Sequence, residues 1–181
     1  IRDEIIEPTF TGMKESGLIY KGVLYFGLMI TEDGPKVLEY NVRLGDPETQ
    51  VLLPIVIADF GNVAAGIVNS SLSTVPISES SYSAVGVVVA SGGYPSDYKK
   101  GIPVEPIPEP GNRHILVFHA STKRNDAGEV VTGGGRCFTV VGLGKDTLDA
   151  ASTAYRFVDS VKFEGAWYRK DIGKKFFIDE V

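Results

Sequence analysis

The pattern most suggestive of chemistry consists of three polar side chains at alternate positions: Glu39, Asn41 and Arg43. The segment that contains them, residues 37–43 (VLEYNVR), predicts a strand whose side chains point to opposite faces in turn. One face would carry a carboxylate, an amide oxygen and a guanidinium about 7 Å apart at each step. Mg²⁺ accepts such oxygen ligands, with phosphates completing its shell. An arginine beside it would stabilise the charge that builds during phosphoryl transfer.

The opposite face of this strand is apolar, and we expect it to pack on a core; it consists of Leu38, Tyr40 and Val42. Alternation alone favours a simpler interpretation of the polar face. In that interpretation the face is solvated, and Glu39 and Arg43 pair weakly.

Three further polar groups follow at a predicted strand-to-helix junction. Asp46 is a good helix N-cap, Pro47 suits the first helical position, and Glu48 complements the helix dipole. The junction also offers backbone N–H groups to an anion, and Asp46 or Glu48 could hold an ammonium group. Helix capping and substrate binding are compatible, so both interpretations stay open.

A hairpin is expected to position the polar strand. Residues 22–30 (GVLYFGLMI) are typical of a buried strand, and Asp33-Gly34 predicts the turn that leads into a second strand at 36–43. Residues 1–16 predict the end of a helix, and the apolar spacing after Asp59 predicts another. The fold class is therefore α+β.

A serine-rich stretch near residues 70–82 marks the expected boundary with a second, strand-rich lobe. Its strands are predicted at 84–90, 114–120, 129–132 and 137–144. One helix, at about 146–162, is predicted to be capped by Asp146 and Thr147 and to face inward through Leu148, Ala151, Tyr155 and Val158.

Composition limits the class of protein. Hydrophobic residues make up 43% of the 181 residues and charged residues 23%, a balance typical of soluble globular proteins. The net charge of −5 argues against nonspecific binding of nucleic acid, and no apolar run is long enough for a membrane span. Because Cys137 is the single cysteine, no internal disulfide can form, which fits the cytoplasm. The chain starts at Ile1, and we expect a fragment of a longer protein.

A family resemblance makes these patterns specific. The passage YKGVLYFGLMITEDGPKVLEYNVRLGDPETQVLLP (20–54) resembles the strand–turn–strand–helix passage of the phosphoribosylamine–glycine ligases, also called glycinamide ribonucleotide synthetases. RLGDPETQ is similar to the most diagnostic motif of this ATP-grasp family, and carboxylases and peptide ligases of the superfamily lack RLGDPE. Further matches keep the order of the family's C-terminal half: ASGGYPSDYKKG (90–101), VFHASTK (117–123), VVTGGGR (130–136) and YRKDIG (168–173).

The resemblance implies the domains and the reaction. Residues 1–72 would be the C-terminal part of an ATP-grasp domain, with antiparallel strands plus helices, and residues 82–181 a small β-rich C-terminal lobe. The family joins glycine to 5-phosphoribosylamine with ATP, through an acyl phosphate of glycine. The parts that hold adenine and triphosphate would precede Ile1, so we expect the chain to be inactive without that upstream half. Whether later purine-pathway enzymes are fused to it stays open.

The resemblance also implies roles for the polar strand and junction. Glu39 and Asn41 would ligate the Mg²⁺ or Mn²⁺ that bridges the ATP phosphates, and Arg43 would face the transferred phosphoryl group. Asp46 and Glu48 are candidates for the glycine or amine end. Several other ATP-grasp enzymes place a further metal carboxylate where this sequence has Gly27, which implies fewer protein ligands here.

Basic residues near the end of the second lobe are candidates for the ribose phosphate. Arg169 and Lys170 are adjacent, and two cations at a turn could grip a phosphate, although an exposed basic turn explains them equally well. Arg136 is a second possible contact. His119 is predicted to be a core histidine and Cys137 a buried packing residue.

Two rival functions stay open. One is a non-catalytic module that binds a partner protein or a nucleotide sugar. The other is an ATP-grasp ligase with a different acceptor.

Overall fold

The computed structural model describes residues 1–173, so the last residues of the predicted domain 82–181 lie outside the described part. The described chain forms two compact units. The first comprises residues 1–46 and 58–77, and the second comprises residues 47–57 and those from Ser78 onward. Both units combine helices with antiparallel sheets, so the predicted α+β class is confirmed.

The first unit contains a helical segment and an antiparallel hairpin. A π-helical turn, η1 (Arg2–Ile6), continues into α1 (Glu7–Glu15), and β1 (Tyr25–Thr31) pairs with β2 (Gly34–Asn41). The turn consists of Glu32 and Asp33, because Thr31 pairs with Gly34. Gly34 has a φ of +90°, a conformation that glycine adopts at low cost. The hairpin prediction is therefore confirmed, with the turn one residue earlier.

The rest of the first unit is helical. α3 (Phe60–Val68) begins where the sequence predicts it, because the Asp59 carboxylate accepts a hydrogen bond of 3.0 Å from the Asn62 backbone N–H. A short 3₁₀ helix, η3 (Leu72–Thr74), follows.

One sequence expectation for this unit is wrong. Leu38, Tyr40 and Val42 were expected to pack on a core, yet their exposed fractions are 64%, 49% and 65%. Tyr40 contacts Phe26 edge-on, and its hydroxyl lies 3.1 Å from Thr9 Oγ1. The apolar face of the hairpin is thus left largely uncovered by the described residues.

The second unit is built on a four-stranded antiparallel sheet in the order β10–β5–β9–β6. Its strands are β5 (Ser83–Ala90), β6 (Ile115–His119), β9 (Arg136–Gly144) and β10 (Trp167–Tyr168). Two small ribbons accompany it, formed by β3 (Val56–Ile57) with β4 (Ser78–Glu79) and by β7 (Thr122–Arg124) with β8 (Val130–Thr132). The predicted strands of this lobe are confirmed to within one residue at each end.

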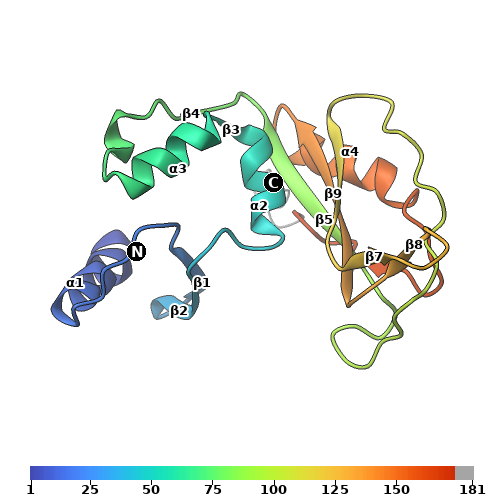
Figure 1. The fold of residues 1–181 in the computed structure, drawn as a ribbon, viewed down its shortest axis with the longest axis horizontal. Coiled ribbons are helices and arrows are strands. Elements are labelled where there is room, and N and C mark those ends of the chain that lie inside the picture. The colour runs from blue at the N-terminus through green and yellow to red at the C-terminus, as the bar shows by residue number, and fades with distance from the viewer. Residues whose placement is uncertain (174–181) are drawn as a thin grey trace. The chain divides into compact units, whose positions relative to one another are not determined.

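Helix α4 (Thr147–Val158) packs on the pair β5 and β9, as Figure 1 shows. Its N-cap is Asp146, whose carboxylate accepts a 2.8 Å hydrogen bond from the Asp149 N–H, as predicted. The helix ends four residues earlier than expected, at Val158. Leu148 is 60% exposed, so its predicted inward orientation is wrong, whereas Ala151 and Val158 are buried.

The core of this unit lies between α4 and the sheet. Its fully buried members are mostly valines on β5 and β9 together with residues of α4: Val87, Phe138, Val140, Ala154 and Val158. Cys137 is buried among them, as predicted, and burial raises the pKa of its thiol. His119 is exposed instead of buried; its Nδ1 lies 2.9 Å from Thr122 Oγ1, and its ring packs on Phe138.

Residues 47–57 join the second unit through α2 (Glu48–Leu52) and the 3₁₀ turn η2 (Leu53–Ile55). The helix begins at Glu48, and its N-cap position is occupied by Pro47, without a side-chain cap. The prediction that Asp46 caps this helix is therefore wrong. In the described part of the chain, no helix combines the length and the apolar composition that crossing a bilayer requires.

The close approach of α4 to β9 depends on two glycines of β9. A methyl group at Gly142 would overlap the backbone of Ala150 and Ala154, and one at Gly144 would overlap Ala150. We expect Gly142→Ala to lower the free energy of unfolding by about 2 kcal/mol, because helix and strand must move apart. Urea denaturation of the chain measures this.

Gly111→Ala is the matched control, since no atom lies within 4 Å of the added methyl group. We expect it to change stability by less than about 0.5 kcal/mol. Equal stability of the two variants would contradict direct packing of α4 on the β9 backbone.

Candidate active site

The hairpin of the first unit brings the two predicted metal ligands together. Glu39 and Asn41 lie on the same face of β2, and Asn41 Nδ2 donates a 3.0 Å hydrogen bond to Glu39 Oε1. Glu39 is exposed and Asn41 is half-buried. The carboxylate is therefore held by its neighbour while it stays open to a ligand.

The glycine opposite Glu39 explains how its side chain fits against the hairpin. Gly27 of β1 pairs with Glu39, next to an irregularity in the register between Gly27 and Leu28. A methyl group at Gly27 would lie 2.8 Å from Glu39 Cγ, closer than carbon atoms pack. The bare glycine therefore leaves the space that the Glu39 side chain occupies.

The donor set at this position fits a hard divalent cation. A carboxylate and an amide side chain supply oxygen ligands, and Mg²⁺ commonly takes one or two protein oxygens and completes its shell with phosphates and water. No group of three or more histidine, cysteine, aspartate or glutamate side chains able to hold a metal occurs among residues 1–173. Glu39 and Asn41 would supply two of the oxygen ligands of such a cation.

The other site residues predicted in this passage, Arg43, Asp46 and Glu48, lie beyond the end of the strand. β2 ends at Asn41, so Arg43 lies beyond it, exposed, and its Nη1 donates a 3.1 Å hydrogen bond to the Leu44 carbonyl oxygen. Asp46 is exposed and is the last residue of the first unit's opening segment, whereas Glu48 is half-buried in the second unit. The division between the two compact units therefore falls within the RLGDPETQ motif, between Asp46 and Pro47.

The basic turn of the second unit comprises residues 169–172 (RKDI), directly after β10. Arg169 donates two hydrogen bonds to the carboxylate of Asp171, from Nε at 2.9 Å and from Nη2 at 2.6 Å. These bonds raise the pKa of Arg169 and fix the direction of its guanidinium. Lys170 is exposed beside it.

Two tyrosines connect α4 to this part of the chain. The Tyr155 hydroxyl donates a 2.8 Å hydrogen bond to the Arg169 carbonyl oxygen and accepts one of 3.0 Å from the Ile172 N–H. The Tyr168 hydroxyl donates a 2.5 Å hydrogen bond to Asp159, which follows α4. That bond, with partial burial, raises the pKa of Tyr168 to about 12. Neither contact is predicted from the sequence, in which Tyr155 has the spacing of a core residue.

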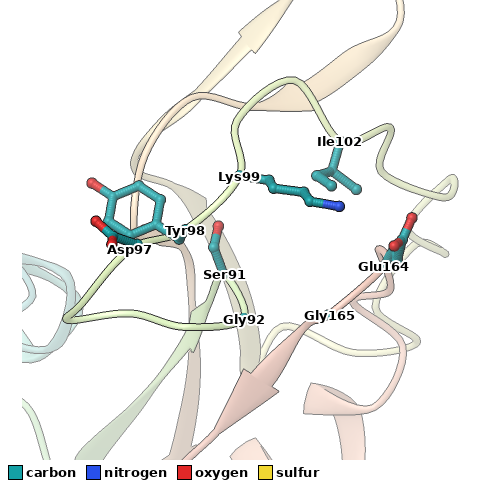
Figure 2. Close-up of a pocket in the computed structure, with 8 residues that line it drawn as sticks. All are labelled: Ser91, Gly92, Asp97, Tyr98, Lys99, Ile102, Glu164 and Gly165. Atoms are coloured by element: carbon teal, nitrogen blue, oxygen red, sulfur yellow. The ribbon is translucent and has the colours of Figure 1, made fainter.

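A pocket of about 450 Å³ lies at the loop that follows β5. It is lined by Ser91, Gly92, Asp97, Tyr98, Lys99, Ile102, Glu164 and Gly165. Figure 2 shows the Lys99 side chain extended toward the side where Ile102 and Glu164 lie. A methyl group at Gly92 would lie 2.9 Å from the Gly165 carbonyl oxygen, so the glycines of this loop have a structural role.

Arg136 opens β9 at the opposite end of that strand from the glycines that contact α4. It is half-buried, its backbone pairs with Ala90, and its carbonyl oxygen accepts a 2.9 Å hydrogen bond from the Ser121 N–H. A buried glycine precedes it, Gly135, where a methyl group would overlap the ring of Tyr94. The backbone of Arg136 is thus firmly held.

Two family profiles match the chain. The profile "Phosphoribosylglycinamide synthetase, C domain" matches residues 84–175, and "Phosphoribosylglycinamide synthetase, ATP-grasp (A) domain" matches residues 1–49. A phosphoribosylamine–glycine ligase of Caldanaerobacter subterraneus is 43% identical over 95% of the chain and 40% of that relative. The trifunctional purine biosynthetic protein adenosine-3 of Gallus gallus is 45% identical over 96% of the chain and 17% of that relative.

Solved structures show similar folds. The phosphoribosylamine–glycine ligase of Thermotoga maritima matches with a TM-score of 0.78 and 38% identity, over 94% of this chain and 41% of that one. The biotin carboxylase domain of the Hydrogenobacter thermophilus 2-oxoglutarate carboxylase matches with a TM-score of 0.61 at 16% identity, which indicates a shared ATP-grasp-like fold alone; it covers 92% of this chain and 39% of that one. The chain thus spans about 40% of the single-function relatives it matches.

We predict that Gly27→Ala disturbs the Glu39 side chain. The added methyl group would push Glu39 Cγ away and break the hydrogen bond from Asn41. We therefore expect the side-chain amide signals of Asn41 to shift in the ¹H–¹⁵N NMR spectrum of the chain. Gly12→Ala, with no atom within 4 Å of its methyl group, should leave those signals in place. Unchanged Asn41 signals in Gly27→Ala would rule out this account of Gly27.

The contact between Tyr168 and Asp159 predicts a pH dependence. The pKa of Tyr168 in the folded chain, about 12, lies above the usual value of 10.0 for tyrosine. The stabilisation from this tyrosine is therefore complete below the unfolded pKa and is lost as the pH rises through the folded pKa. In a difference titration of wild type against Tyr168→Phe, we expect little tyrosinate from Tyr168 at a pH of about 11. A midpoint near the usual tyrosine value would contradict the contact.

Proposed function

Because the chain belongs to the phosphoribosylglycinamide synthetase family, we propose that it forms part of a longer enzyme that joins glycine to 5-phosphoribosylamine. The products would be glycinamide ribonucleotide, ADP and phosphate, a step of purine biosynthesis. The observation that carries the proposal is the pairing of Glu39 with Asn41 on one strand face, directly before RLGDPE.

The proposed reaction has two steps. A carboxylate oxygen of glycine attacks the γ-phosphorus of ATP, ADP leaves, and glycyl phosphate forms. The amine of phosphoribosylamine then attacks the glycyl carbonyl carbon, the C–O bond to phosphate breaks, and the amine loses a proton. An arginine is the side chain expected to stabilise the transferred phosphoryl group, and Arg43 is our candidate.

The proposed metal site consists of Glu39 and Asn41, which would hold Mg²⁺ or Mn²⁺ through side-chain oxygens. When bound, the cation would neutralise charge on the ATP phosphates. The biotin carboxylase domain with the related fold was solved with the magnesium salt of ADP, which supports the choice of Mg²⁺ with an adenine nucleotide. Gly27 and the Asn41 amide would act by keeping the Glu39 carboxylate in place.

Charged side chains are our candidates for the acceptor end. We assign Asp46 and Glu48 to the ammonium group of glycine or to the amine of the sugar, because carboxylates pair with such groups. We assign Arg169 and Lys170 to the ribose phosphate, with Arg136 as a further contact. Asp171 supports the assignment of Arg169, because its carboxylate sets the direction of the guanidinium.

The remaining partners follow from the length of the relatives. Since the chain spans about 40% of the single-function ligases, we propose that the rest of the ATP-grasp domain covers the exposed apolar face of the hairpin, formed by Leu38, Tyr40 and Val42.

Fusion to other purine enzymes is a proposal supported by the trifunctional relatives. A cytoplasmic location fits the reduced Cys137. The proposed domain bounds stay 1–72 and 82–181.

We predict that Glu39→Gln lowers kcat about 100-fold in the full-length ligase, because the amide binds a divalent cation weakly and adds no charge. Phosphate release with ATP, glycine and phosphoribosylamine measures this. The control is Glu32→Gln, which makes the same change in the turn of the same hairpin and should leave kcat within about twofold. Equal activity of both variants would contradict the proposal that Glu39 binds the metal.

The same assay tests the reaction as a whole. The 181-residue chain alone should release no phosphate above background, and the full-length polypeptide should do so only when glycine and phosphoribosylamine are both present. Release that depends on another amino acid instead of glycine would point to a ligase with a different acceptor.

A further inference from the structure

Tyr155 is the residue through which α4 holds the basic turn. Its hydroxyl contacts the backbone of the turn at both ends, by donating to the Arg169 carbonyl oxygen and accepting from the Ile172 N–H. The turn lies beyond β10, which ends at Tyr168, so the sheet does not set its conformation. One hydroxyl group thus closes the loop of residues 169–172.

The ring of Tyr155 is fixed in turn by its surroundings. It is half-buried and packs, together with Ile172, against Ala150, Ala151 and Val85. Residues 149–154 of α4 pack directly on the β9 backbone. The position of the Tyr155 hydroxyl is therefore set by the core and not by the turn. The turn therefore takes its position from α4.

The side chains of the turn complete the arrangement. Arg169 has its carbonyl oxygen bound by Tyr155 and its guanidinium bound by Asp171, so both backbone and side chain are constrained. A phosphate group requires donors in fixed directions, and preorganised donors bind more tightly because less conformational entropy is lost.

We propose that Tyr155 is a positioning residue that presents Arg169 and Lys170 to the phosphate of the sugar substrate. This inference rests on the proposed function, which assigns those two cations to the ribose phosphate. Tyr155 itself does not touch the substrate; it acts through the backbone of the turn. Loss of its hydroxyl would free the turn while the ring keeps its packing.

The matched control is the neighbouring tyrosine. The rings of Tyr168 and Tyr155 lie 6.2 Å apart, and each hydroxyl makes a hydrogen bond that a phenylalanine cannot make. The Tyr168 hydroxyl, however, bonds the side chain of Asp159 and not the backbone of the turn. Comparing Tyr155→Phe with Tyr168→Phe therefore separates the positioning of the turn from the general loss of a tyrosine hydroxyl.

The experiment measures steady-state kinetics of the full-length ligase and inhibition by ribose 5-phosphate, which carries the same phosphate. For Tyr155→Phe we expect KM for phosphoribosylamine and the inhibition constant of ribose 5-phosphate to rise about tenfold, since a hydrogen bond contributes roughly that factor. KM for ATP and kcat should stay within about twofold. Tyr168→Phe should leave all four constants within about twofold.

A second measurement does not depend on activity. Amide hydrogen exchange at Ile172, measured by NMR on the 181-residue chain, should be faster in Tyr155→Phe than in wild type and unchanged in Tyr168→Phe. Unchanged exchange in Tyr155→Phe would overturn the proposal, because the turn would then be held without the hydroxyl.

Two further variants separate the inference from the proposed function. If Lys170→Ala and Arg169→Ala raise KM for phosphoribosylamine but Tyr155→Phe does not, the positioning role is wrong and the phosphate contact stands. If neither cation variant changes that KM, the phosphate contact is wrong and the inference is overturned with it. A general fall in kcat for Tyr155→Phe, with KM unchanged, would also overturn it.

Discussion

The contact between α4 and β9 is the constraint on which the second unit depends. Gly142 and Gly144 have no side chains, so the backbone of the helix lies directly against the backbone of the strand. This close approach buries the small residues of α4, including Ala150 and Ala154, and aligns the helix with the strand. The turn after β10 is in turn hydrogen-bonded to α4 through the Tyr155 hydroxyl.

A glycine also permits a close contact in the first unit, but there it is a contact with a side chain. Gly27 admits a side chain where the glycines of β9 admit a backbone, so that Glu39 lies across the hairpin and accepts a hydrogen bond from Asn41. In each unit an exposed side chain proposed to be functional is oriented by a neighbouring group: Glu39 by the Asn41 amide, and Arg169 by Asp171. Gly27 and Tyr155 contribute to this orientation although neither is predicted from the sequence to contact a substrate or a metal.

Much of the fold could be predicted from local patterns, because those patterns reflect forces that act over a few residues. The hairpin, the start of α3 after Asp59, the N-cap Asp146 and the strands of the second lobe follow from turn residues, apolar spacing, a capping side chain and β-branched runs. Two of the errors lie at the starts of helices. Asp46 does not cap α2, and Leu148 faces solvent at the helix start although its spacing is that of a core residue.

The sequence by itself determined that Glu39 and Asn41 share a strand face, since alternation is a property of the extended backbone, although it placed Arg43 on the same strand, which ends at Asn41. The sequence also carried the motif RLGDPE, by which the family is recognised. Tertiary structure alone decided that Gly27 lies opposite Glu39 and that Tyr155 bonds both ends of the turn at residues 169–172. The physical reason is that such contacts join residues far apart in the chain, or fix a direction in space, and no local preference encodes either.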